Sequence, residues 1–211
     1  MKHEFILAVH VDALSDIQER GVVGLPSTLP FDQSKLIIAQ REWLEHSDDY
    51  RQFISYTALR NARGEYFLYQ RTKMAGEQKL HGKHSIGFGG HLELMDVYMN
   101  DDNGVDVECS LDMSMQRELL EETGLAVGQL VPNNGAKMEH HGWLISSRDA
   151  VDSKHIAVLN VLELSDDVIA DLDFSEEDQE PIGWYLLEDI ITDDLESWSE
   201  QFINRLKVLG E

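Results

Sequence analysis

The sequence predicts an α/β fold, because segments with the composition of strands alternate with segments that have helical spacing. Runs rich in β-branched and aromatic residues stand at 51–60 and 65–72, and apolar residues recur at helical spacing in 110–123 and 197–209. The chain has 211 residues, of which 42% are hydrophobic, so it can bury a sizeable core and fits one domain over residues 1–211. We expect a globular, soluble protein.

Along the chain, the first strand is expected at 4–11, and residues 21–30, with two prolines and two glycines, are expected to form an irregular connection. Apolar residues within 34–46 favour a helix. The two strand-like runs of 51–72 flank the sequence NARG, which predicts a β-hairpin. Further strands are expected at 142–147, 155–164 and 182–187.

Two helices carry recognisable ends. The segment 110–123 has Ser110 as its expected N-cap and Gly124 as its C-terminal stop. The last helix is expected to begin with a capping box formed by Ser197 and Glu200. Its apolar residues share one face, which predicts an amphipathic helix packed on the body of the protein: Trp198, Phe202, Leu206 and Leu209.

Charge and cysteine content restrict the classes of partner. The formal net charge is -23, with 40 acidic against 17 basic side chains, so we expect no nucleic acid polymer and no membrane as partner. The single cysteine, Cys109, excludes an intrachain disulfide, and a cytoplasmic location is expected. No apolar run approaches the ~20 residues that span a bilayer, and the N-terminus lacks the pattern of a signal peptide.

Three glutamates gather near the end of the helix at 110–123. Glu118, Glu121 and Glu122 are spaced i, i+3 and i+4, so their carboxylates share one face within about 5 to 6 Å. Each like-charge pair lowers helix stability by about 0.2 to 0.5 kcal/mol, and the negative end of the helix dipole lowers it by about 0.3 to 1 kcal/mol more for each acid. A bound Mg²⁺ or Mn²⁺ would reverse that cost. An exposed acidic helix face is the alternative, and it is common in acidic chains.

Two features before these glutamates point to a diphosphate ligand. The sequence GFGGHLE, residues 87–93, holds three glycines, as expected of a loop whose backbone approaches something closely. Residues 60–84 hold six lysines and arginines against two glutamates, in a chain that is otherwise strongly acidic. We expect Arg71, Lys73 and Lys83 to neutralise phosphates of a substrate; a solvated hairpin face is an equal alternative.

Together these residues resemble the Nudix box, G-x5-E-x7-R-E-U-x-E-E-x-G-U, in which U is a bulky aliphatic residue. The opening of the box is similar to GGHLE at 89–93, but it lies 13 residues too early. We therefore infer an insertion at about 94–108, with Glu108 or Asp112 in place of the glutamate that is missing at Cys109. The second half matches at every fixed position: Arg117, Glu118, Leu119, Glu121, Glu122, Gly124 and Leu125.

The resemblance covers roughly residues 50–209 and is specific at 86–125, which leaves 1–50 as an N-terminal extension. The sequence is also similar to a bacterial subgroup of predicted phosphoesterases. The resemblance implies an α/β/α sandwich around a mixed β-sheet. It also implies hydrolysis, at phosphorus, of a nucleoside diphosphate linked to another group, X, and a homodimer is common in the family.

Carried onto this sequence, the resemblance implies a set of site residues. Arg117 would orient the glutamates by charge-assisted hydrogen bonds, and Gly89 would contact the substrate. The base that takes the proton of the attacking water would be Glu121, Glu176 or Glu177. The implied metal ligands are Glu118, Glu121, Glu122 and the Gly90 carbonyl, and the implied catalytic residues are Arg117, Glu118, Glu121 and Glu122.

Other residues are not assigned a role in the site. His91, His140 and His141 are read as surface or hydrogen-bonded polar residues. Aromatic residues of the predicted strands are read mainly as core, although they could stack on a base: Tyr56, Tyr66, Tyr69 and Trp143.

Two other classes of protein remain open. Some Nudix-like domains sense a ligand without cleaving it, typically after losing box glutamates; all three are present here, which favours a pyrophosphatase or phosphoesterase. Isoprenoid-diphosphate isomerases share the fold but rely on a cysteine near the strand before the box, whereas Cys109 lies after the glycine loop. The identity of X is set by loops outside the box and does not follow from the sequence.

Overall fold

The chain forms two compact units, and four long elements contribute residues to both. The computed structural model describes residues 4–14, 21–23 (backbone only), 31–73, 80–127, 136–174, 177–191 and 193–210. Unit 1 comprises Met1–Tyr56, Gly89–Met115 and His140–Leu159, and unit 2 comprises Thr57–Phe88, Gln116–Glu139 and Asn160–Glu211. The shared elements are β4 (Tyr50–Asn61), α2 (Val107–Thr123), β10 (Ala136–Ile145) and β11 (His155–Leu164).

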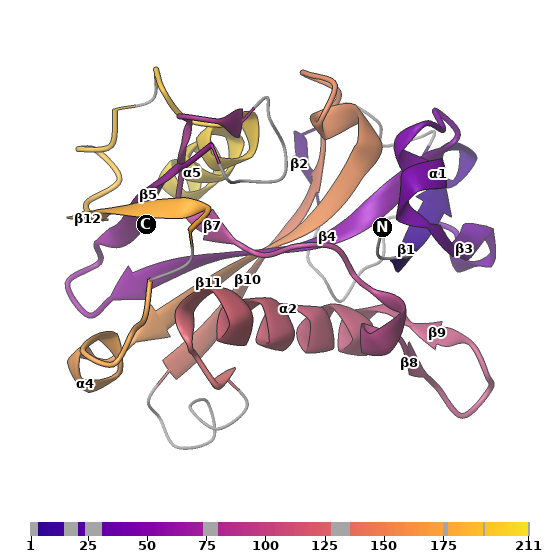
Figure 1. Cartoon of the computed structure of the whole chain (residues 1–211), viewed down its shortest axis with the longest axis horizontal. Coiled ribbons are helices and arrows are strands. Elements are labelled where there is room, and N and C mark those ends of the chain that lie inside the picture. Colours follow the sequence, from indigo (N-terminus) through magenta and orange to yellow (C-terminus); the bar gives the residue numbers. More distant parts are fainter. Residues whose placement is uncertain are drawn as a thin grey trace. The chain divides into compact units, whose positions relative to one another are not determined.

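Antiparallel pairing builds the sheet of unit 1. The strand β1 (Phe5–His10) pairs with β3 (Leu36–Gln40) on one side and with β4 on the other (Figure 1). β10 pairs with β2 (Gly21–Val23), and β11 lies between β4 and β10 in the strand order. The strands predicted at 4–11, 142–147 and 155–164 are therefore present, the second beginning at Ala136.

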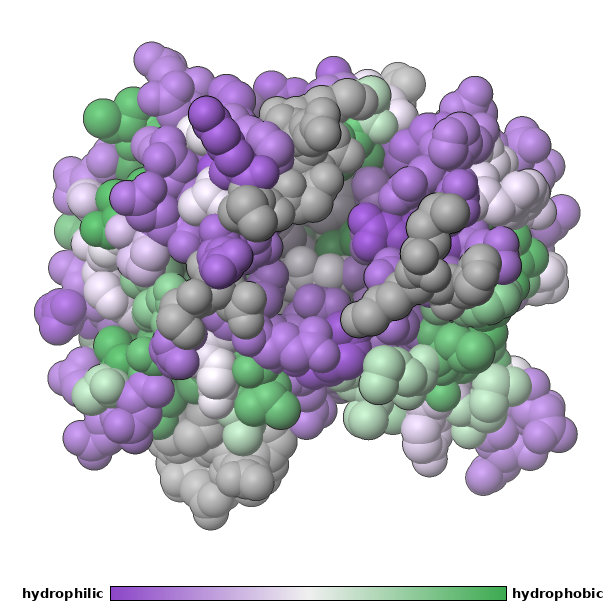
Figure 2. Space-filling model, viewed as in Figure 1, coloured by the Kyte–Doolittle hydropathy of each residue, from purple (hydrophilic) through white to green (hydrophobic). Residues whose placement is uncertain are grey.

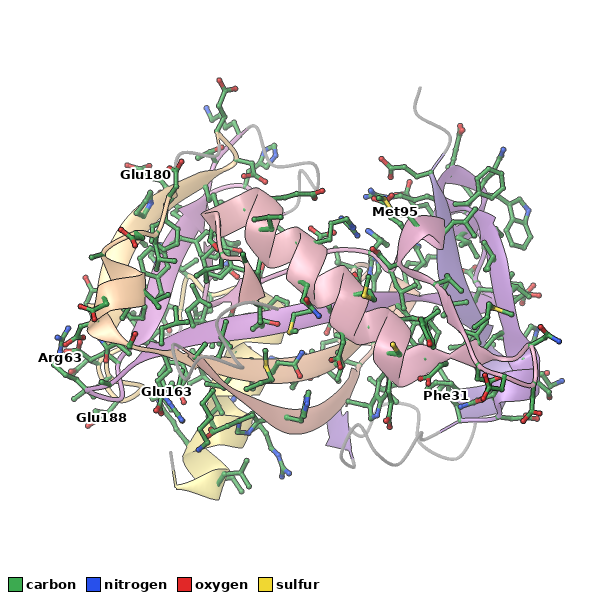
Figure 3. All side chains as sticks on the ribbon, turned by 90° about the horizontal axis from the view of Figure 1, so that it is seen from below. Phe31, Arg63, Met95, Glu163, Glu180 and Glu188 are labelled. Atoms are coloured by element: carbon green, nitrogen blue, oxygen red, sulfur yellow. The ribbon has the colours of Figure 1, made fainter. Side chains whose placement is uncertain are left out.

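The core of unit 1 lies on both faces of this sheet. Leu7 and Val9 point to the face covered by the first turns of α2, and Ile6 and Ala8 point to the opposite face, where Leu44 of α1 (Arg41–Glu45) packs. This alternation is the two-residue period of a strand. Two faces covered by helices agree with the predicted α/β/α sandwich. Phe31, labelled in Figure 3, packs on Phe53 and Trp143 with ring centroids 5.4 and 5.7 Å away.

Two expectations for the first 46 residues are wrong. The helix predicted over 34–46 is instead a 3-10 turn η2 (Gln33–Lys35), the strand β3 and the short helix α1. A run of four apolar residues suits a strand or a helix equally, and pairing with β1 decides for the strand. Residues 21–23, expected to be irregular, form β2, and 24–30 lie outside the described residues.

Unit 2 contains the predicted hairpin. β4 turns at Asn61–Gly64 into β5 (Tyr66–Arg71), which pairs with β12 (Gln179–Tyr185) and with β6 (His84–Ser85). β7 (Gly87–Phe88) pairs with β4. The helix α5 (Ser197–Leu209) buries Phe202 and Leu206, as its spacing predicts, and also Ile203. Leu209, expected on the same face, is instead 48% exposed in the last turn, and Trp198 is half-buried. A short helix α4 (Asp166–Ile169) follows β11.

The two predicted helix starts are both corrected. α2 begins at Val107, and the carboxylate of Asp106 accepts from the N–H of Cys109 at 3.0 Å, so Asp106 takes the capping role expected of Ser110. α5 has Glu196 at its N-cap, without the Ser197 capping box. The end of α2 is as predicted: Gly124 has φ +73° and its N–H donates to the carbonyl of Leu120.

The inferred box insertion forms structure of its own in unit 1. It contains the 3-10 turn η4 (Leu94–Asp96) and the hairpin of β8 (Tyr98–Met99) and β9 (Val105–Asp106). Four of its large side chains are exposed: Leu94, Met95, Tyr98 and Met99. At the lower right of Figure 2, hydrophobic green surface lies beside a hydrophilic purple projection. Among the described helices, none is long and apolar enough to cross a membrane.

Candidate active site

In unit 2, the last two turns of α2 bring Arg117 together with two of the three glutamates. The Arg117 guanidinium donates to the carboxylate of Glu118 at 2.7 Å and to that of Glu121 at 3.2 Å. The side chains of Arg117 and Glu118 are 14% and 13% exposed, whereas that of Glu121 is 59% exposed. Leu119, between them in sequence, is fully buried and anchors this part of the helix. The cation thus offsets the repulsion that the glutamate spacing creates.

Glu122 stands one residue further and is half-buried. Its negative charge acts on Tyr69, whose phenol is fully buried and donates to the Gly87 carbonyl at 2.6 Å. Burial raises the pKa of Tyr69, the cation of Arg71 opposes that rise, and the charge of Glu122 adds to it. Tyr69 is therefore a neutral hydrogen-bond donor at physiological pH.

The donor chemistry of the three glutamates fits a hard divalent cation, because Mg²⁺ and Mn²⁺ prefer carboxylate oxygens. Within the described residues, however, no three His, Cys, Asp or Glu side chains are gathered as they are around a metal ion. Glu118 and Glu121 face Arg117 instead. Arg117 contacts one oxygen of each carboxylate, so a cation bound at these glutamates would share the carboxylates with the guanidinium.

Two of the basic residues predicted to bind phosphate are adjacent in unit 2, and one is already in an ion pair. Arg71 Nε donates to the carboxylate of Glu196 at 2.8 Å, and the other oxygen of that carboxylate accepts from Ser85 Oγ at 2.7 Å. Glu196 is only 4% exposed. The backbone N–H of Arg71 donates to the carbonyl of Lys83, which is half-buried, while Lys73 is exposed. Arg71 thus has a structural role that the sequence did not reveal.

In unit 1, the glycine loop approaches strand β4 very closely. Gly89 has φ +144°, and a Cβ built on it would lie 1.8 Å from the carbonyl oxygen of Ser55. The Gly90 carbonyl accepts from the N–H of Ser55 at 3.1 Å, and Ser114 Oγ of α2 donates to the carbonyl of His91 at 3.3 Å. The close approach predicted from the glycines is therefore present, and within unit 1 the partner of that approach is the backbone of β4.

The comparisons with known proteins identify the fold. No family model matches the chain. Protein YmaB of Bacillus subtilis (strain 168) is 26% identical over 196 residues, which cover 89% of this chain and 88% of that protein. The crystal structure of Tm1382, a candidate Nudix hydrolase, superposes with a TM-score of 0.69 at 20% identity and covers 98% of this chain and 99% of Tm1382. The chain has the Nudix fold.

A second similar structure is a Nudix domain that was crystallised with a ligand. It is the NUDIX domain of Shewanella oneidensis NrtR in complex with ADP-ribose, with a TM-score of 0.51 at 16% identity; the match covers 81% of this chain and 97% of that domain. At these identities the likeness establishes the fold alone. Because the match with Tm1382 covers 98% of the chain, it includes nearly all of residues 1–50, which the sequence had set apart as an extension.

The remaining predictions about the Nudix site have mixed outcomes. Glu108 and Asp112, the substitutes inferred for the missing box glutamate, are both exposed on α2. Among the residues considered as general base, Glu177 is exposed and its carbonyl accepts from Thr72 Oγ1 at 2.6 Å, whereas Glu176 lies outside the described residues. The interpretation of the strand aromatics as core is confirmed, because all four are buried: Tyr56, Tyr66, Tyr69 and Trp143.

One aromatic residue near the end of α2, Phe174, is packed although no sequence pattern predicts it. Phe174, in the acidic segment after β11, stacks on Phe67 with ring centroids 4.0 Å apart and planes inclined by 9°. The next residue back, Asp173, donates its N–H to the Thr123 carbonyl at the end of α2. Only the isolated aromatic residue within this acidic segment could have indicated from the sequence that part of it is packed.

Proposed function

We propose that this protein is a metal-dependent hydrolase that cleaves the diphosphate linkage of a nucleoside diphosphate bonded to another group, X. The observation that supports the proposal is the complete Arg-Glu-x-x-Glu-Glu set on α2, in which Arg117 contacts both Glu118 and Glu121. Arg117 offsets part of the repulsion, but three acids at the negative end of a helix still oppose folding, so their presence favours a function that uses them.

The glutamates would hold Mg²⁺ or Mn²⁺ by their carboxylates, with the Gly90 carbonyl as the further ligand that the Nudix resemblance names. When bound, such an ion lowers the pKa of water and neutralises phosphate charge. Glu121, with the most exposed carboxylate of the Arg117 group, is the residue we propose to accept the proton of the attacking water.

Arg117 would act as a positioning residue. Its guanidinium contacts two carboxylates at once, so it fixes their side-chain orientation and lowers their mutual repulsion before a ligand arrives. For phosphate binding we retain Lys73 and Lys83 with the backbone of Gly89. Arg71 would contribute its positive charge from its place beside Glu196.

A ligand-sensing module is the second candidate, because the NrtR NUDIX domain was crystallised with ADP-ribose. The intact glutamate set favours the enzyme. The isomerase alternative receives no support from Cys109: partial burial, together with Asp106 and Asp112, raises the pKa of its thiol. A raised pKa keeps the sulfur protonated, whereas a nucleophilic or acid-base cysteine usually has an activated thiolate.

The proposal is tested by a substrate screen with Mg²⁺ or Mn²⁺ against nucleotide sugars, dinucleoside polyphosphates, ADP-ribose, NADH and nucleoside triphosphates. We expect turnover of at least one compound, and Glu121→Gln should lower kcat by about 10² to 10⁴-fold. The matched control is Glu188→Gln, which neutralises an exposed glutamate elsewhere in unit 2 and should leave kcat unchanged. Binding of one compound without cleavage would instead establish the sensor.

A further inference from the structure

Two histidines that are far apart in the sequence meet in unit 1. His91 follows the glycine loop and forms a bridge with Ile54 of β4, and His155 is the first residue of β11. Their Nε2 atoms are 3.2 Å apart, and the rings are inclined by 61° with centroids 5.2 Å apart. Both side chains are half-buried, so solvent reaches the pair.

The ring of His155 is fixed by its other nitrogen. His155 Nδ1 lies 2.7 Å from the carbonyl oxygen of Val151. A carbonyl oxygen only accepts, so Nδ1 carries the hydrogen, and in the neutral ring Nε2 presents its lone pair toward His91. This backbone contact is the arrangement that commonly orients a histidine whose opposite nitrogen binds a metal.

The segment that carries His155 is held by a buried arginine. Arg51 of β4, 3% exposed, donates to the Ser146 carbonyl at 2.6 Å, to Ser147 Oγ at 2.7 Å and to the His155 carbonyl at 3.3 Å. The Ser146 hydroxyl also donates to the carboxylate of Asp152 at 2.6 Å. These contacts fix the backbone on both sides of the turn before β11, so the position of the imidazole is set before any ligand binds.

We propose that His91 and His155 form a site for a transition-metal ion such as Zn²⁺, separate from the glutamates of α2. Two imidazole nitrogens that bind one tetrahedral Zn²⁺ at about 2.0 to 2.1 Å lie about 3.3 to 3.4 Å apart. The observed separation of 3.2 Å needs only a small adjustment to match that value. Imidazole nitrogen suits Zn²⁺, Ni²⁺ and Cu²⁺, whereas Mg²⁺ prefers oxygen, so the two proposed sites differ in the ion that each prefers.

The site supplies two protein ligands from the described residues, in which no group of three metal-binding side chains occurs. The remaining coordination positions are open to water or to an anionic ligand, as in sites that bind exchangeable groups. The competing explanation is a plain hydrogen bond in which His91 Nε2–H donates to His155 Nε2. Both explanations predict the same apo geometry, so only metal addition separates them.

The test is calorimetric titration of untagged, chelator-treated full-length protein with Zn²⁺. We expect one binding event that survives the combined Glu118→Gln, Glu121→Gln and Glu122→Gln change. His91→Gln and His155→Gln should each weaken it by at least about tenfold, equivalent to about 1.4 kcal/mol. His46→Gln is the matched control, because His46 is an exposed histidine of unit 1 whose Nδ1 also contacts a backbone carbonyl.

A second measurement on the wild-type protein keeps the proposal testable if a histidine variant fails to fold. In ¹⁵N spectra of the histidine rings, Zn²⁺ should shift the Nε2 resonances of both His91 and His155. Unchanged affinity in both variants, loss of Zn²⁺ binding in the glutamate variant alone, or unshifted ring resonances would each overturn the proposal in favour of the plain hydrogen bond.

Discussion

At Gly89 the backbone takes a φ of +144°, which side-chain-bearing residues rarely adopt, and the space where a Cβ would stand is filled by the Ser55 carbonyl. Both conditions require glycine, and neither depends on a ligand. The glycine loop of the box is therefore explained in part by packing against β4. The sequence predicted the close approach correctly, but glycines alone do not reveal which group they approach.

We expect Gly89→Ala to destabilise the protein by about 3 kcal/mol or more, because the new Cβ would force either the loop or β4 to move. Gly82→Ala is the matched control: Gly82 has φ +77° but open space around it, so only the backbone strain of about 1 to 2 kcal/mol applies. Urea unfolding measures both values. Equal losses in the two variants would contradict the steric explanation.

The ion pair of Arg71 and Glu196 leads to a second prediction about single residues. Glu196→Gln removes the charge from a buried hydrogen-bonded carboxylate, and we expect a loss of about 1 to 3 kcal/mol in the free energy of unfolding. Glu45→Gln breaks the exposed pair of Glu45 with Arg41 and should cost less than about 1 kcal/mol. Thermal or urea unfolding distinguishes the two. A negligible effect of Glu196→Gln would mean that Arg71 is not held by this carboxylate.

Among the elements, strands rich in β-branched and aromatic residues and a helix with a clear stop were predicted well, whereas helix starts and short strands were not. The hairpin of β4 and β5, strand β11 and the end of α2 at Gly124 follow from local composition. The start of α2 does not follow from local composition. Its cap, Asp106, belongs to the β8–β9 hairpin, and the Nudix box pattern has no such hairpin. β3 depends on its pairing with β1, which no local pattern encodes.

The cap of α2 is testable at the level of that helix. Asp106→Ala removes the acceptor for the Cys109 N–H and should lower the free energy of unfolding by about 1 kcal/mol. Asp102→Ala, at the exposed tip of the same hairpin, is the control and should change it by less than about 0.5 kcal/mol. Equal effects of Asp106→Ala and Asp102→Ala would contradict the capping role of Asp106.

For the whole molecule, the sequence predicted the Nudix fold, because the resemblance rests on residues at fixed spacing within one helix. It did not predict the pairing of Arg71 with Glu196, the packing of Phe174 on Phe67 or the meeting of His91 with His155. Each of these contacts joins residues that are far apart in sequence and carry no shared motif. The glutamate cluster remains the feature on which the proposed activity depends.

Calorimetric titration of the whole protein with Mg²⁺ tests that activity most directly. We expect the wild-type protein and Glu188→Gln to bind Mg²⁺. Binding should disappear when Glu118, Glu121 and Glu122 are all changed to glutamine. Mg²⁺ uptake that is absent from the wild type, or equal in the glutamine variant, would contradict the proposal that these carboxylates bind the catalytic ion.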